Sequence, residues 1–209
     1  MQDEWFLSTK ETGTRFPLYL RNTLSIESGF VSAEMSFPNG TIWISGTLHN
    51  IYSIGMALEQ EGFKIINNIT WQKTNPPPNL ACRCFTHSTE TILWAQKDEK
   101  KSKHLFNYQL MKQQNSGKQM KDVWTGPLTP QKEKAFGKHP TQKPIYLLER
   151  IIEASTNSGA IVLDPFCGSS TTGVAANMLG RKYIGIDNVE EYIALSVRRL
   201  QQEVLHEEF

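Results

Sequence analysis

Two stretches of the sequence contain residue types that could bind a ligand or perform chemistry. In the first, "VLDPFCGSSTTGVAA" (162–176), an apolar run ends at Asp164, passes through a turn of small residues and becomes amphipathic. A strand, a glycine-containing turn and a helix N-terminus form a ligand cradle, because small residues allow close approach and free amides face the ligand. The stretch lacks the Gly-Lys-Ser/Thr of a phosphate-binding P-loop and the full Gly-x-Gly-x-x-Gly dinucleotide pattern.

The sequence separation between this turn and the next acid is also informative. Asp187 ends the next apolar run, nineteen residues after Gly168, at the position where such folds hold ribose hydroxyls. The pair predicts a nucleoside ligand. The alternative is that Gly168 only turns the chain and that Asp187 only caps the helix that begins near Val189.

The second stretch, "WQKTNPPPNLACRCFTH" (71–87), contains Asn75-Pro76-Pro77-Pro78. Enzymes that methylate exocyclic amino groups of bases use a similar Asp/Asn/Ser-Pro-Pro-aromatic motif, which accepts hydrogen bonds from the amine and stacks a ring on the extruded base. The aromatic residue is absent here. We therefore interpret the prolines as a rigid, extended turn that presents Asn79 and Arg83 to DNA.

The pattern of apolar residues predicts an α/β fold. Strand-length apolar runs lie at 41–46, 63–71, 90–95, 160–164 and 183–187. Helical spacing of apolar residues occurs at 50–61, 144–156, 170–179 and 190–204. Alternating strands and helices predict a Rossmann-like, mostly parallel sheet covered on both faces. Residues 1–37 show neither period.

Charge is unevenly distributed although the net charge of the 209 residues is only +1. Residues 97–143 hold eleven lysines against four acids, with aromatic residues between them. Lysines contact phosphates and aromatic rings stack on bases, so this segment predicts a nucleic-acid partner, with Lys118, Lys121 and Trp124 as candidate contacts. A solvated lysine-rich loop is the alternative.

Composition excludes several classes of protein. The three cysteines, Cys82, Cys84 and Cys167, lack the spacing of a zinc site or a disulfide framework, so we expect no metal. No run approaches the length of a membrane helix and no signal pattern begins the chain. We therefore expect an intracellular protein.

The order of the motifs resembles one known family. "HPTQKPIYLLERIIEAS" (139–155), "DPFCGSSTTG" (164–173) and "GRKYIGIDNVEEYIALSVRRL" (180–200) are similar to the β group of S-adenosylmethionine-dependent amino-methyltransferases of DNA. Within this group the likeness is greatest to the DpnA-type adenine methyltransferases that act within GATC. It covers roughly residues 38–204.

The resemblance implies S-adenosyl-L-methionine as the cofactor, and it implies a role for each matching residue. The residues that would surround the methionine and adenosine parts of the cofactor are Asp164, Pro165, Phe166, Gly168, Ser169, Thr171 and Thr172. Asp187 would hold the ribose, and His139, Thr141, Gln142 and Lys143 would form a wall near the methionine. The family usually has glycine where Ser170 stands, which would cost about 1 kcal/mol if the position needs a positive φ.

The resemblance places the catalytic motif of the family before about residue 20, after an apolar strand, and it is not found there. Asp3 and Trp5 in "DEWFLS", and Tyr19 in "RFPLYLRN", are weak candidates. The resemblance therefore predicts a chain that is truncated or rearranged at its N-terminus.

The resemblance also divides the chain and defines its function. The parts are a divergent segment at 1–37, a catalytic half at 38–97, a target-recognition segment at 98–138 and a cofactor-binding half at 139–209. The leading hypothesis is an adenine-N6 methyltransferase of a restriction-modification system that acts on double- or single-stranded DNA. The resemblance implies the cytoplasm of a prokaryotic cell as its location. An inactive remnant that binds cofactor or DNA and a cytosine-N4 methyltransferase stay open as alternatives. An exposed sheet edge makes a homodimer a further expectation.

Overall fold

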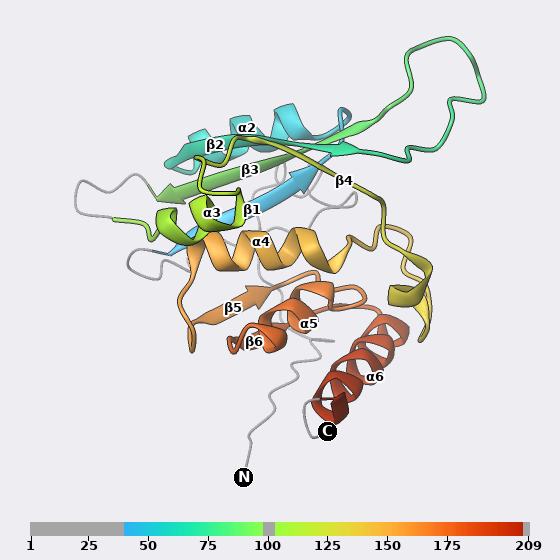
Figure 1. The fold of residues 1–209 in the computed structure, drawn as a ribbon. Coiled ribbons are helices and arrows are strands. Elements are labelled where there is room, and N and C mark those ends of the chain that lie inside the picture. The colour runs from blue at the N-terminus through green and yellow to red at the C-terminus, as the bar shows by residue number, and fades with distance from the viewer. Residues whose placement is uncertain (1–39, 98–102, 207–209) are drawn as a thin grey trace. The chain divides into compact units, whose positions relative to one another are not determined.

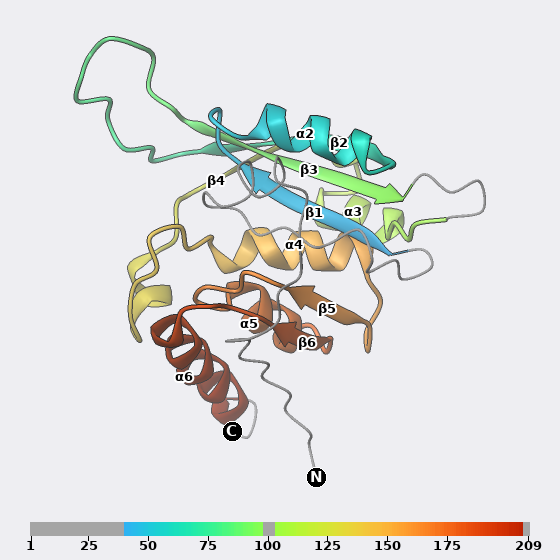
Figure 2. The same ribbon diagram turned by 180° about the vertical axis from the view of Figure 1, so that it is seen from behind.

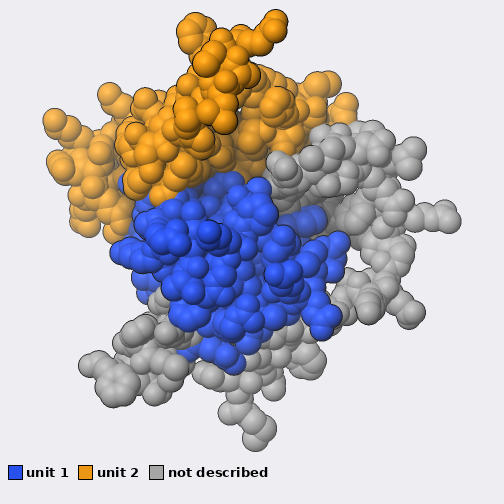
Figure 3. Space-filling view, turned by 90° about the vertical axis from the view of Figure 1, so that its right-hand side faces the viewer, with its two compact units in different colours: residues 1–15, 29–31, 129–209 blue, residues 16–28, 32–128 orange. Residues whose placement is uncertain are grey.

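The computed structural model describes residues 40–97 and 103–206, which fall into two compact units (Figure 3). The described part of unit 2 comprises residues 40–97 and 103–128, and that of unit 1 begins at Thr129. The boundary after Leu128 falls inside the predicted target-recognition segment, and the four-part division of the chain stays a prediction.

The described residues of unit 2 form a four-stranded sheet with two helices (Figure 1). Along the chain its elements are β1 (Thr41–Gly46), α2 (Ile51–Gln60), β2 (Phe63–Lys73), β3 (Thr89–Lys97), α3 (Tyr108–Gln114) and β4 (Val123–Gly126). The strand order is β1-β3-β2-β4. Because α2 returns the chain before β2 begins, β1 and β2 run in the same direction, as a crossover connection requires.

The prediction of an α/β fold is confirmed, but the sheet of unit 2 is less parallel than expected. β3 lies between β1 and β2 and is antiparallel to both, whereas β2 pairs with β4 in parallel. The reason is the connection after β2. Residues 74–88 contain no crossover helix, so the chain turns back and β3 pairs beside the strand that it has just left.

The two faces of this sheet are covered differently, because side chains alternate along each strand. On one face Leu93 lies opposite Ile44 and packs toward Gly55 of α2. On the other face Trp43 stacks on Trp94 with ring centroids 4.7 Å apart. Rings from the segment before α3 continue this aromatic cluster, with Phe106 at 5.7 Å from Trp94.

Unit 1 packs its helices against a short parallel pair of strands (Figure 2). Its elements are η1 (Gln131–Lys134), α4 (Ile145–Ser155), β5 (Ile161–Asp164), α5 (Thr171–Met178), β6 (Lys182–Gly185) and α6 (Glu190–His206). A small core forms where Ile152 of α4 meets Ala175 and Ala176 of α5, with Tyr183 packed against them.

The predicted elements agree closely with those observed. Every predicted strand and helix is present, with bounds that differ by at most two residues at each end. The sequence pattern missed the short elements α3, β4 and η1, all of which lie in the lysine-rich segment. Among the residues that the structure describes, no helix is both long enough and apolar enough to cross a membrane.

Two helical glycines provide a matched test of this packing. A methyl group at Gly173 would lie 2.4 Å from the ring of Tyr183, whereas one at Gly55 would meet Leu93 at an ordinary 3.7 Å. We therefore expect Gly173→Ala to lower the free energy of unfolding by about 1–3 kcal/mol, and Gly55→Ala to raise it by about 0.5–1 kcal/mol. Urea unfolding measures both. Equal effects of the two substitutions would contradict the packing of Tyr183 on α5.

Candidate functional site

The carboxylate of Asp164 connects the end of β5 to the start of α5. Its Oδ2 accepts a hydrogen bond from Thr172 Oγ1 at 2.6 Å, and its Oδ1 accepts one from the Phe166 amide at 3.2 Å. The side chain therefore holds both ends of the loop of residues 165–170.

Burial makes this carboxylate costly to ionise. Desolvation raises the pKa of Asp164 and the nearby charge of Asp187 raises it further, while the bonds from Thr172 and Phe166 act in the opposite direction. The loop is thus built around a partly buried acid whose charge is stabilised by two directed hydrogen bonds.

The loop itself needs two left-handed residues. Gly168 has φ +52° and Ser170 has φ +50°, and the Ser170 amide donates to the Cys167 carbonyl at 2.7 Å. A Cβ at Gly168 would lie 3.0 Å from Nε2 of His139, so both conformation and space require glycine there. At Ser170 serine adopts the conformation that costs it about 1 kcal/mol, as the sequence suggested for this position. Its hydroxyl lies 3.1 Å from the Tyr183 hydroxyl.

Helix α6 holds the carbonyl side of the loop. Ser196 Oγ donates to the Gly168 carbonyl at 2.8 Å, and Arg199 donates to the Ser169 carbonyl and, at 3.0 Å, to Thr171 Oγ1. Arg199 is only 5% exposed. Neither residue is among those predicted from the sequence. The signal was present, because the polar pair lies on the same helical face as Leu195, which is also buried.

Asp187 has the capping role that the sequence offered as one of two alternatives, and it also bonds the loop, while its contact with a ribose stays a prediction. Its Oδ2 accepts from the Gly168 amide and its Oδ1 accepts from the Val189 amide, both at 2.9 Å. It therefore joins the loop to the start of α6 and also caps the chain before that helix. Each carboxylate oxygen can accept more than one hydrogen bond, so capacity remains for ribose hydroxyls.

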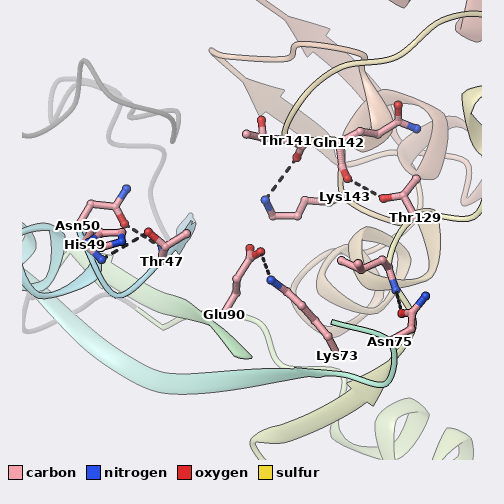
Figure 4. A network of polar contacts seen from close by, with 11 residues as sticks. Thr47, His49, Asn50, Lys73, Asn75, Glu90, Thr129, Thr141, Gln142 and Lys143 are labelled. Atoms are coloured by element: carbon pink, nitrogen blue, oxygen red, sulfur yellow. Dashed lines mark hydrogen bonds and ion pairs between the residues drawn. The ribbon is translucent and has the colours of Figure 1, made fainter. Parts of the chain in front are cut away.

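The segment before α4 places a histidine beside the loop. The ring of His139 lies against Gly168 and meets the ring of Tyr192 at 4.3 Å in a T-shaped contact. Burial lowers the pKa of His139, so the neutral ring is favoured. The hydroxyl of Thr141 lies 3.3 Å from His139 Nδ1. Lys143 Nζ donates to the Thr141 carbonyl at 3.3 Å (Figure 4).

Gln142 makes its contacts away from this loop. Its Nε2 donates to the Glu133 carbonyl at 2.9 Å, and its own carbonyl accepts from Thr129 Oγ1 at 2.6 Å. Glu133 in turn accepts from the Ile145 amide at the start of α4 at 3.0 Å. These contacts give Gln142 a scaffolding part in unit 1.

The arrangement offers donors and acceptors of the kinds that a nucleoside with a carboxylate could bind. The first turn of α5 has no side-chain cap, so its amides are available to an anionic group such as a carboxylate. Asp187 offers acceptors to a ribose. Phe166, within the loop, is 48% exposed and offers an apolar face for an adenine ring.

The DNA contacts predicted in unit 2 differ in their exposure. Arg83, Lys118 and Lys121 are exposed. Trp124 is 6% exposed, and its indole nitrogen donates to the Lys121 carbonyl at 2.9 Å. The structure therefore corrects its predicted role, because a ring packed in the core offers no face to a base. The amide of Asn79 is also occupied, since it donates to the Cys84 carbonyl at 2.7 Å.

The proline stretch has a structural contact at its start. Asn75 Oδ1 accepts from the Leu128 amide at 2.8 Å, which ties the stretch to the end of β4 (Figure 4). This agrees with its interpretation as a rigid turn. The weak catalytic candidates Asp3, Trp5 and Tyr19 lie outside the described residues.

Fold and loop together define a nucleoside-type cofactor cradle on an α/β scaffold, and comparison with known proteins identifies the family. A family model described as DNA methylase matches residues 33–198, so the chain belongs to the DNA methylase family.

Individual relatives are also similar. The chain is 68% identical over 173 residues to the type II methyltransferase M2.DpnII of Streptococcus pneumoniae, an alignment that covers 83% of this chain and 65% of the relative. It is 70% identical over 165 residues to M2.LlaDCHI of Lactococcus lactis subsp. cremoris, which covers 79% and 61%. The crystal structure of the M1.HpyAVI–SAM complex matches with a TM-score of 0.68 and 38% identity, over 80% of this chain and 78% of that one. The chain spans less than two thirds of the length of the curated relatives that it matches.

The raised pKa of Asp164 predicts a dependence of stability on pH. The folded state binds this proton more tightly than the unfolded state, whose pKa is near 3.8, so the stability it contributes is full below that value and is lost as pH rises through the folded pKa. Asp164→Asn cannot ionise, so it should gain stability relative to the wild type as pH rises above about 4, the ordinary pKa of an aspartate.

Urea unfolding at several pH values measures the difference. Thr172→Val provides the matched comparison, because removal of its hydrogen bond to Asp164 should raise the pKa further and steepen the loss of stability. A stability difference between Asp164→Asn and the wild type that does not change with pH would contradict this account.

Strain at Ser170 predicts a difference between two small substitutions. Ser170→Gly loses the contact with Tyr183 but removes the strain of a side chain at positive φ. Ser170→Ala loses the same contact and keeps the strain. We expect the alanine variant to be less stable than the glycine variant by about 1 kcal/mol in parallel urea unfolding. An alanine variant as stable as the glycine variant would show that the left-handed conformation costs nothing.

Proposed function

We propose that the chain binds S-adenosyl-L-methionine at residues 164–172 and Asp187 and transfers its methyl group to adenine N6 in DNA. The observation that carries the proposal is the loop anchored by Asp164, with its left-handed residues leading into the uncapped first turn of α5. When bound, the cofactor supplies an electrophilic methyl group on a sulfonium.

The residues of this chain supply binding and orientation. Asp187 holds the ribose, Phe166 covers the adenine, and the amides at the start of α5 meet the carboxylate. Thr141 and Lys143 extend the polar wall beside the methionine part. Methyl transfer needs no covalent intermediate, so positioning of the two reactants accounts for the catalysis.

The relatives support both the reaction and the cofactor. Two of them carry the name type II methyltransferase, and a similar solved structure is a complex with SAM. Action within GATC, as part of a restriction-modification system, follows from the resemblance to the DpnA type. For this chain the activity is a proposal, since it spans less than two thirds of those relatives.

DNA binding is assigned to the lysine-rich segment. Its described exposed lysines are Lys103, Lys118, Lys121, Lys132 and Lys138. Several lysine–phosphate contacts would make the affinity fall steeply with salt. Both double- and single-stranded DNA are candidate substrates in the bacterial cytoplasm, and a homodimer stays a prediction.

A second candidate function is the binding of cofactor or DNA without methyl transfer. It is favoured by the amino-acid sequence, which contains no Asp/Asn/Ser-Pro-Pro-aromatic motif to accept the hydrogen bonds of the target amine. In the nearest match to that motif, Asn75-Pro76-Pro77-Pro78, the side-chain oxygen of Asn75 already accepts a hydrogen bond from the Leu128 amide.

Methyl transfer from labelled cofactor tests the proposal. Duplex and single-stranded oligonucleotides with GATC are compared with a control in which these four bases are permuted. We expect label in N6-methyladenine, only in GATC-containing DNA, with a rate that falls as salt is raised. Label in N4-methylcytosine would assign the other amino-methylation instead.

The same samples separate the second candidate from failure of the whole account. Calorimetric binding of the cofactor without any incorporation would identify a binding protein. Neither binding nor incorporation would contradict the proposed function altogether.

A further inference from the structure

The loop between β2 and β3 presents two large apolar side chains to solvent. Phe85 is 97% exposed and Leu80 is 89% exposed, more than any other large apolar side chain that the structure describes. The loop extends well beyond the strands that it joins (Figures 1 and 2). Such exposure is unfavourable in water and points to a partner that covers these side chains.

The base of the loop is fixed to the sheet. Lys73 and Glu90 form an ion pair at 2.7 Å across the ends of β2 and β3 (Figure 4). The Lys73 amide also donates to the Ser88 carbonyl at 2.8 Å, and Asn75 bonds the Leu128 amide. Three consecutive prolines, 76–78, then limit the conformations of the first half of the loop.

The tip of the loop is closed by one side chain. Asn79 Oδ1 accepts from the Ala81 amide at 3.1 Å, while its Nδ2 donates to the Cys84 carbonyl at 2.7 Å. Leu80 lies within this closed turn and Phe85 follows it directly. The hydrogen bonds of Asn79 therefore fix the backbone from which the two exposed side chains project.

The position and charge of the loop favour a polyanion. It leaves the carboxyl end of β2, and the carboxyl ends of parallel strands are where ligands bind in open α/β sheets. Residues 74–89 contain no aspartate or glutamate, and Arg83 lies between the two apolar side chains. The nearest acid along the chain, Glu90, is already paired with Lys73.

We propose that Leu80 and Phe85 form an apolar wedge that enters the base stack of duplex DNA while Arg83 contacts the phosphate backbone. Apolar side chains inserted between base steps unstack them, and a base whose amino group is to be modified must leave the stack. The wedge rests on the proposed action on DNA and adds a specific part of the chain that opens the duplex.

The test uses the full chain and the variants Phe85→Ala and Leu80→Ala, alone and combined. Tyr52→Ala is the matched control, because Tyr52 is an apolar side chain on α2 that is 71% exposed and lies outside the loop. The probe is a duplex with 2-aminopurine in place of the adenine of GATC, whose fluorescence rises when the base is unstacked. Affinity for this duplex and for its single strand is measured alongside.

We expect the double variant to bind the duplex about 10-fold more weakly and to lose the fluorescence rise, while single-strand affinity changes by less than about 3-fold. Tyr52→Ala should match the wild type. Unchanged melting temperatures establish that the variants are folded. Duplex affinity and fluorescence within about 2-fold of the wild type in the double variant would overturn the wedge.

Other outcomes are equally decisive. Loss of self-association with unchanged DNA binding would overturn the wedge and assign the loop to a contact between copies of the chain. A wild type that binds no duplex would also overturn it. Duplex opening that depends on Phe85, in the absence of methyl transfer, would support the wedge and contradict the proposed function. Methyl transfer that neither substitution changes would support the proposed function and contradict the wedge.

Discussion

The hydrogen bonds of the Asp164 carboxylate are the constraint on which the loop between β5 and α5 depends. One oxygen holds the hydroxyl of Thr172 and the other holds the amide of Phe166, so the end of a strand and the start of a helix share one anchor. The loop between them can then adopt two left-handed residues, at Gly168 and Ser170, which an unanchored chain would rarely populate together. The carboxylate loses hydration in the process, and this cost appears as its raised pKa.

The remaining contacts of the loop divide its polar groups between scaffold and ligand. Ser196 and Arg199 take the carbonyls of Gly168 and Ser169, and Asp187 takes the Gly168 amide. With the carbonyls already bonded to α6, the amides at the start of α5 are the groups left for a cofactor. Buried hydrogen bonds thus preorganise the loop and reduce the entropic cost of ordering it when a ligand binds.

Much of this could be read from the sequence because the evidence was local. Periodicity located the described strands and helices other than α3, β4 and η1. The spacing of Gly168 and Asp187 located the turn and the acid that the structure joins by a hydrogen bond. The strain at Ser170 was also accessible, because a family position that prefers glycine suggests a positive φ.

What the sequence could not provide were contacts between distant segments. The antiparallel position of β3 depends on a loop that carries no crossover helix, and the inward turn of Arg199 depends on packing against a loop thirty residues away. Trp124 looked like a base-stacking residue because lysines surround it in sequence. Its burial follows from its place in a strand beside Trp71, which no local pattern reveals.

Amide hydrogen exchange with and without S-adenosylmethionine tests the central claim most directly, because it reports on the loop whether or not methyl transfer occurs. The cradle predicts slower exchange at residues 164–174 and 185–189 when the cofactor is added, with the same protection absent in Asp164→Ala. Unchanged exchange in these segments at saturating cofactor, or protection confined to other parts of the chain, would contradict it.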